Sequence, residues 1–268
     1  MVNVLSLDAS RNSGGRLEDF VGGSLYASFR NDLALNTNFG MGGTVSTDVN
    51  FLAPVSTLTS ANLATANVLI WSQRSAPSAP EKSAIASFVN DGGSLMVISQ
   101  QVPSFIDLLG GNSTFSQYSA YLGNYSSVST PITDGAFGNI TGQASDPTQP
   151  SNAALPSAST GFRLVLNEGA LPAGSITGMR NEFGNAVSAT SLVGLGRVAI
   201  FGDDNLFIDP KYAGPNAANR SAALNTFAWL GAGSVTAVPE PSSIALTAIA
   251  IIPIARRLGR KLLGSRLV

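Results

Sequence analysis

The side chains that could bind or react with a ligand follow the ends of four predicted strands. They are Asp8 and Ser10, then Ser72, Gln73 and Arg74, then Ser99 and Gln100, and finally Asp203, Asp204 and Asn205. In an open parallel sheet, ligands bind outside the carboxyl ends of the strands, where the strand order changes direction. Carboxylates, amides and one guanidinium at such an edge could hydrogen-bond a sugar or another small polar molecule. Alternatively, these loop residues satisfy only the polar groups of their own backbone.

Acidic residues after the last of these strands permit two further interpretations. Asp203, Asp204 and Asp209 could hold calcium through oxygen ligands, although the glycine and the closing glutamate of an EF-hand loop are missing. The simpler interpretation is that Asp203 caps the turn after the strand and that the chain holds no metal. Asp8 and Asp203 could also act as the carboxylate pair of a glycoside hydrolase, if they stood about 5 to 9 Å apart.

A glycine pattern before the last strand does not predict a cofactor. Gly194 and Gly196 begin a G-x-G-x-x-A string. In a dinucleotide-binding site, this string follows a strand and opens a helix. Here it precedes the predicted strand at 197–201, so we expect an ordinary turn and no bound cofactor.

Two absences exclude the Ser-His-Asp, Cys-His-Glu and zinc hydrolase mechanisms. The chain contains no cysteine and no histidine. It therefore has no thiolate nucleophile, no disulfide and no sulfur-ligated metal. It also lacks the commonest general base and the commonest transition-metal ligand. Any catalysis would depend on carboxylates, Lys, Arg, Tyr or hydroxyl groups.

The charge distribution divides the chain into an acidic body and a basic end. Five of the 15 Lys and Arg residues follow Ala255, which leaves 10 basic residues against 16 acidic ones before it, a formal net charge of −6. An acidic body argues against nucleic acid as a partner. Only 12% of the residues are charged, and Ser, Thr, Asn, Ala and Gly are abundant. This composition is typical of secreted bacterial proteins.

The C-terminal thirty residues form a short polar motif, an apolar segment and a basic end. The motif is Val238, Pro239, Glu240 and Pro241, and the basic residues are Arg256, Arg257, Arg260, Lys261 and Arg266. This order resembles the PEP-CTERM sorting signal of bacterial surface proteins. The resemblance implies that an exosortase-type enzyme processes the chain, which is exported, anchored in the membrane and then displayed at the cell surface or released.

The apolar segment of this tail is short for a membrane span. Fifteen uncharged residues separate Glu240 from Arg256, and as a helix they would reach roughly 22 Å. A hydrocarbon core is about 30 Å thick, so a buried or interfacial helix is the alternative. Because Lys and Arg are retained on the cytoplasmic side, a spanning segment would leave everything before Pro239 outside. We expect the tail to anchor the chain in the membrane.

An exported chain normally begins with a charged region and an apolar region. Here Met1 leads directly into a predicted strand at 2–7. We therefore expect a leader peptide encoded upstream of Met1 or already removed. The alternative is that the chain is never exported and its tail is a decayed signal.

The body shows alternating strand and helix patterns. Predicted strands lie at 2–7, 44–52, 67–71, 94–99, 162–167, 186–193 and 197–201, and predicted helices at 17–29, 78–90, 103–109 and 216–230. The clearest unit begins with a capping box at Ser78 and Glu81 and ends at Gly92 and Gly93. A strand on each side of this helix predicts a parallel βαβ crossover.

The order of these units resembles the class I glutamine amidotransferase-like superfamily, in particular its non-catalytic and trehalose-utilisation-like branches. The matching segments are 67–71, 88–95, 131–138, 196–203 and 224–230. The resemblance implies a flavodoxin-like α/β fold, with a mostly parallel sheet flanked by helices, an antiparallel edge and a C-terminal hydrophobic helix. Ser99 and Gln100 stand where catalytic members carry a nucleophilic cysteine, so glutaminase chemistry is excluded.

These observations predict the domain organisation and the function together. Residues 1–230 form the α/β body, 111–160 a loop-rich insertion, 231–237 a linker and 238–268 the sorting signal. We expect an exported bacterial surface or extracellular-matrix protein with a non-catalytic binding or structural role, associated with exopolysaccharide. The alternative is a glycan hydrolase that uses Asp8, Asp203 and Asp204.

Overall fold

The computed structural model describes most of the α/β body. The described residues are 1–11, 19–73, 75–98, 102–112, 116–118, 123–125, 128–142, 163–181, 184–202, 204, 206–209, 212 and 217–233. They all belong to one compact unit, Met1–Ser234. The predicted sorting signal, its apolar segment and its basic end lie outside the described residues.

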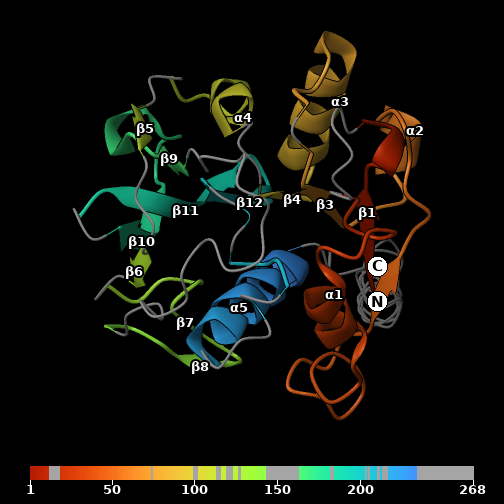
Figure 1. The fold of residues 1–268 in the computed structure, drawn as a ribbon. Coiled ribbons are helices and arrows are strands. Elements are labelled where there is room, and N and C mark those ends of the chain that lie inside the picture. The colour runs from red at the N-terminus through yellow and green to blue at the C-terminus, as the bar shows by residue number, and fades with distance from the viewer. Residues whose placement is uncertain are drawn as a thin grey trace, which may run out of the picture. The chain divides into compact units, whose positions relative to one another are not determined.

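An eight-stranded sheet forms the centre of the body, in the order β2-β1-β3-β4-β12-β11-β10-β6 (Figure 1). Its strands are β1 (Val2–Ser6), β2 (Val49–Phe51), β3 (Val68–Trp71), β4 (Ser94–Ile98), β6 (Gly123–Tyr125), β10 (Ile176–Asn181), β11 (Ala186–Val193) and β12 (Gly196–Phe201). The first five strands in this order, from β2 to β12, pair in parallel. The last three, β11, β10 and β6, continue the sheet with antiparallel pairing. The five parallel strands have the flavodoxin-like order 2-1-3-4-5. The predicted fold class is therefore confirmed.

Helices cover both faces of the sheet because successive side chains of each parallel strand point to opposite sides. On one face, Val2 and Val4 of β1 pack with helices α1 (Ala27–Ala34) and α5 (Ala217–Gly233). On the other face, Leu5 and Leu7 belong to the core beneath α2 (Ser60–Leu63), α3 (Ala79–Asn90) and α4 (Val102–Leu108). Figure 1 shows α1 and α5 below the sheet and α3 and α4 above it.

The βαβ unit has the structure that the sequence predicted. Helix α3 begins after Ser78, and both hydrogen bonds of the capping box with Glu81 are present. The helix ends at Asn90, and Gly92 has a φ of 106°, which favours glycine at the end of a helix. Strands β3 and β4 on either side of α3 are parallel neighbours.

The sequence predicted a helix at 17–29, of which the structure describes residues 19–29. Most of these residues are not helical. Helix α1 begins only at Ala27, and the residues from Phe20 to Tyr26 form turns. The carboxylate of Asp19 accepts hydrogen bonds from the backbone N–H groups of Val21 and Gly22, both at 2.9 Å. This local bonding competes with a helix, and Gly22 and Gly23 disfavour one further.

The segment at 111–160 contributes short strands as well as loops. Strand β6 forms the outer edge of the main sheet, while β5 (Ser116–Tyr118) pairs with β9 (Arg163–Val165) in a separate two-stranded sheet. The predicted strand at 162–167 therefore lies mostly outside the main sheet. The hairpin of β7 (Asp134–Gly135) and β8 (Gly138–Asn139) contacts α5. Two short 3-10 helices, η1 (Ala9–Arg11) and η2 (Glu168–Ala170), complete the fold.

Within the part of the chain that the structure describes, no helix combines the length and the apolar character that crossing a bilayer requires.

Candidate functional site

The strand order places the ligand edge of the sheet between β1 and β3. The chain continues from β1 to β2 on one side and to β3 on the other, so the crevice lies beyond the carboxyl ends of these two strands. Of the candidate residues predicted from the sequence, Asp8 and Ser10 follow β1, and Ser72 and Gln73 follow β3. The structure therefore brings these two predicted groups to one edge.

Two of these side chains are buried instead of facing a ligand. Gln73 and Ser72 are only 0% and 2% exposed. The Gln73 amide nitrogen donates to the backbone oxygens of Leu7 at 3.2 Å and of Asp8 at 3.4 Å. This side chain joins the loop after β3 to the loop after β1. Its amide nitrogen is thus used within the protein, and the expectation that Gln73 binds a ligand stays a prediction.

Asp8 organises the turn after β1. Its Oδ1 accepts hydrogen bonds from the backbone N–H of Ser10 at 2.9 Å and from the Ser10 hydroxyl. Such a turn fixes the direction of the chain into η1. Asp8 is half-buried and Ser10 is exposed, so of the four candidates these two are the ones that solvent can reach.

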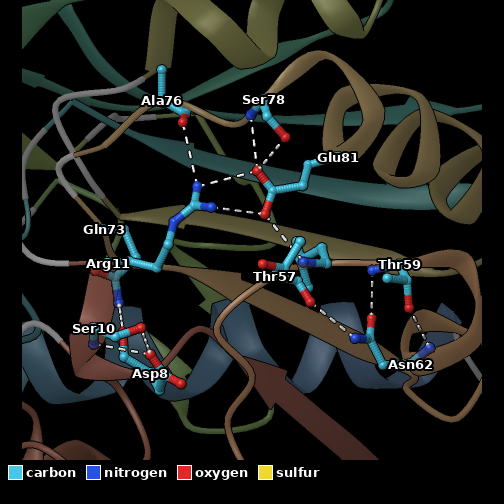
Figure 2. Close-up of polar contacts among 11 residues, drawn as sticks. Asp8, Ser10, Arg11, Thr57, Thr59, Asn62, Gln73, Ala76, Ser78 and Glu81 are labelled. Atoms are coloured by element: carbon cyan, nitrogen blue, oxygen red, sulfur yellow. Dashed lines mark hydrogen bonds and ion pairs between the residues drawn. The ribbon is translucent and has the colours of Figure 1, made fainter.

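An ion pair that the sequence did not predict joins two segments at the same edge of the sheet. Arg11 in η1 donates from Nη1 and Nη2 to the two carboxylate oxygens of Glu81 in α3, at 3.0 and 3.2 Å (Figure 2). Its Nη2 also donates to the backbone oxygen of Ala76 at 3.4 Å. The Glu81 side chain is fully buried and that of Arg11 is 19% exposed. Arg11 thus ties the turn after β1 to the loop and helix after β3.

Glu81 remains charged despite its burial. Burial alone would raise the pKa of Glu81, but hydrogen bonds from the backbone N–H groups of Ser78 and Leu58, from the Ser78 hydroxyl and from Arg11 outweigh it, and the pKa lies below its ordinary value. Ser78 donates its N–H and its hydroxyl to Oε2, both at 2.8 Å, and Leu58 donates to Oε1 at 3.1 Å. The carboxylate is therefore a structural acceptor for three segments of the chain.

Arg11 is also held by an aromatic ring. Its guanidinium carbon lies 5.7 Å from the ring centroid of Trp71, the last residue of β3, which is within the range of a cation–π contact. Trp71 in turn packs edge-on against Phe105 of α4, with centroids 5.1 Å apart. The sequence predicted one part of this arrangement, the capping box that includes Glu81. It has no local pattern that would link Glu81 to Arg11, which lies 70 positions earlier.

The acidic residues after β12 are engaged in contacts with the start of α1. The Tyr26 hydroxyl donates to the Asp204 carboxylate at 3.5 Å, and Asp209 Oδ2 accepts from the backbone N–H of Ser28 at 3.3 Å. Among the residues that the structure describes, no group of three or more acidic side chains could hold a metal ion. Because Asp203 lies outside those residues, the calcium interpretation stays a prediction.

Asp209 acts as the N-cap of α1 from a distant loop, since the residue at the cap position, Tyr26, has no side-chain hydrogen bond to the helix. Replacing Asp209 by Ala should lower the free energy of unfolding by about 1 kcal/mol, the usual contribution of a helix cap. Asp209→Asn keeps an acceptor and should recover most of that loss in urea denaturation. Equal losses in both variants would contradict the capping role.

The strand order separates the two carboxylates of the hydrolase hypothesis. β12, which precedes Asp203, lies three strands away from β1, which precedes Asp8. At about 4.8 Å between neighbouring strands, the strand ends are roughly 14 Å apart. A glycosidase pair needs about 5 to 9 Å. Asp8 and Asp203 would therefore have to approach each other through their loops.

The remaining predicted site residues lie outside the described residues. They are Arg74, Ser99, Gln100, Asp203, Asn205, the sorting motif Val238, Pro239, Glu240 and Pro241, and the basic residues Arg256, Arg257, Arg260 and Lys261.

Comparisons with known proteins describe the fold of the chain. No family model and no curated protein matches it. Among solved structures, the mmIFT52 N-terminal domain is similar at a TM-score of 0.53 and 15% identity, covering 87% of this chain and 99% of that domain. An exo-β-1,4-mannosidase from Opitutaceae bacterium strain TAV5 is similar at a TM-score of 0.48 and 13% identity, covering 85% of this chain and 35% of the enzyme.

A ThuA-like protein from Bacteroides uniformis is similar at a TM-score of 0.43 and 16% identity, covering 85% of this chain and 91% of that protein. At 15% identity, the similarity to the mmIFT52 domain extends to the fold and not to an activity.

Proposed function

We propose that this chain is an exported bacterial surface protein whose α/β body has a non-catalytic binding or structural role. The observation that carries the proposal is the edge between β1 and β3. There, the buried Gln73 amide and the Arg11–Glu81 pair join the two loops that would flank a ligand. A fold of this kind normally places its ligand in this crevice. Here the described polar groups bind mainly one another.

The lack of suitable reactive groups supports a non-catalytic role. Without cysteine or histidine, the carboxylates are the side chains whose ordinary pKa leaves them deprotonated, and so able to accept a proton, at neutral pH. Glu81 bonds to Arg11, Ser78 and Leu58, and Asp209 bonds to the start of α1. Asp8, the remaining described carboxylate at this edge, lies far along the sheet from the strand before Asp203.

The sequence of the tail supports export and surface display. The order of a Val-Pro-Glu-Pro motif, an uncharged segment and a basic end favours membrane retention with the body outside. An exosortase-type enzyme would then process the anchored chain. The usual association of such signals with exopolysaccharide makes a polysaccharide the preferred ligand class.

A sorting experiment tests this proposal in a bacterium that contains an exosortase. The full chain is given an export leader at its N-terminus and an epitope tag between that leader and Met1. It should reach the surface or the medium without its basic end. Replacement of Pro239, Glu240 and Pro241 by Ala should leave the full-length chain in the membrane fraction, because the processing enzyme no longer recognises it. Immunoblots of fractionated cells measure both outcomes.

A double variant, Ser242→Ala with Ser243→Ala, is the matched control, since it changes the adjacent residues and leaves the motif intact. It should be sorted like the unaltered chain. Identical processing of the motif variant and the unaltered chain, or full-length chain in the cytosol in every case, would refute the proposal.

A further inference from the structure

A row of asparagine amides crosses three neighbouring strands at the amino end of the sheet. Asn3 of β1 is in register with Asn50 of β2. Asn67 immediately precedes Val68 of β3, which is in register with Val4, so Asn67 lies beside Asn3. We refer to Asn3, Asn50 and Asn67 as the amide ladder. Its three side chains come from segments up to 64 positions apart in the chain.

Hydrogen bonds hold the amide ladder in a fixed geometry. The Asn50 Nδ2 donates to Asn3 Oδ1 at 3.0 Å, and the Asn3 Nδ2 donates to the backbone oxygen of Thr65 at 3.0 Å. The Asn67 Oδ1 accepts the backbone N–H of Asn3 at 2.8 Å. Each amide is therefore oriented before any ligand arrives, which lowers the entropic cost of binding one.

The amide ladder can be reached from solvent. Asn50 is exposed, and Asn3 and Asn67 are half-buried. In β1, the side chain of Asn3 lies on the same face as Leu5, the face that α2 and α3 cover further along the strands. The Asn50 amide uses one N–H for Asn3, and its carbonyl oxygen can still accept hydrogen bonds and its second N–H can still donate one.

We propose that the amide ladder binds a neutral polysaccharide. The planar Asn50 amide, which keeps a donor beside an acceptor, matches two adjacent hydroxyl groups of a sugar, while its hydrogen bond to Asn3 fixes its orientation at the edge of the sheet. The ladder itself carries no charge, and residues 1–255 have a formal net charge of −6, which disfavours acidic polymers. The inference rests on the proposed function and names a place and a ligand class for it.

Binding at one ladder should be weak and should grow through repetition. The exposed Asn50 amide offers only a few hydrogen bonds, and water competes for each of them. A polymer that presents the same hydroxyl pair many times raises the effective concentration at a second protein on the same strand. Many copies of the chain on a cell surface would therefore bind a polymer more tightly than isolated copies would.

Affinity electrophoresis of the full chain in detergent tests this site. Native gels contain dextran, hydroxyethylcellulose, laminarin or, as an acidic polymer, alginate. The unaltered chain should be retarded by at least one neutral polymer and not by alginate. Asn50→Ala should weaken that binding about fivefold, the usual effect of one lost hydrogen bond. Asn31→Ala is the matched control, because it removes an exposed amide from α1 on the opposite face of the sheet.

The outcomes separate this inference from the proposed function. Retardation that Asn50→Ala and Asn31→Ala leave equally unchanged would overturn the amide ladder as the site, while polysaccharide binding by the chain would stand. If no neutral polymer retards the unaltered chain, both the ladder and a polysaccharide-binding role are refuted. Weaker binding accompanied by a lower melting temperature in Asn50→Ala, but not in Asn31→Ala, would show that the ladder only stabilises the sheet edge.

Discussion

Replacing Glu81 by Gln should lower the free energy of unfolding by about 3 kcal/mol. The substitution removes the charge that balances Arg11, and removing one partner of a buried ion pair typically costs about 3 to 5 kcal/mol. The lower end applies because the Arg11 side chain is 19% exposed and can recover part of its hydration. An amide can also replace only some of the three hydrogen bonds that the carboxylate accepts from Ser78 and Leu58. Urea denaturation measures the loss.

The matched control is another Glu–Arg pair among the described residues, Glu168 with Arg180, whose nitrogen and oxygen lie 2.5 Å apart. Their side chains are 46% and 39% exposed, so solvent screens the attraction. Glu168→Gln should therefore cost less than about 1 kcal/mol. Similar losses for Glu81→Gln and Glu168→Gln would mean that burial does not decide the contribution of Glu81.

The pH dependence of stability follows from the same carboxylate. Because the folded-state pKa of Glu81 lies below its ordinary value, its stabilisation is complete above the unfolded-state pKa and is lost as the pH falls through the folded-state value. The difference in unfolding free energy between the unaltered chain and Glu81→Gln should therefore shrink in acid. A difference that stays constant from neutral to acidic pH would contradict this assignment.

The sequence predicted those elements whose signals are local. The capping box at Ser78 and Glu81 and the two glycines after Asp91 mark the two ends of α3, and the structure has the helix between them. The apolar spacing of four residues from Leu17 predicts a helix over this segment, whereas Asp19 followed by Gly22 and Gly23 favours the turns that the structure shows. In that segment, side chain to backbone bonding prevails over periodicity.

The candidate site was predicted only at the level of the sheet edge. The strand ends that carry Asp8 and Gln73 meet as expected, because the order of parallel strands follows from the βαβ pattern. Whether a side chain faces solvent or a neighbouring loop depends on contacts between distant segments. Gln73 turns toward Leu7, 66 positions earlier, and Arg11 reaches Glu81, 70 positions later. No spacing within the sequence encodes either contact.

Asn225 of α5 makes another contact between distant segments that the sequence does not predict, and its replacement should cause a second large loss of stability. It is 1% exposed, and its Oδ1 accepts the backbone N–H of Phe137 at 2.8 Å while its Nδ2 donates to the backbone oxygen of Gly138 at 2.9 Å. A Cβ at Gly135 would lie 2.7 Å from the Asn225 side-chain oxygen, so glycine permits this approach. One buried amide thus fixes the β7–β8 hairpin, in a segment that the sequence predicted to be an insertion of loops.

Asn225→Leu should lower the free energy of unfolding by about 2 kcal/mol, since it removes two partly buried hydrogen bonds between α5 and the hairpin, each of which contributes about 1 kcal/mol. Thr226→Val, at the next position of α5, is the control. It removes only a hydroxyl that bonds to the backbone oxygen of Ala222 within the same helix, so it should cost about 1 kcal/mol or less. Amide hydrogen exchange gives an independent test, because Phe137 should lose protection in Asn225→Leu and keep it in Thr226→Val. If Phe137 stays protected in both variants, the hairpin is held by its packing against α5 and not by the amide.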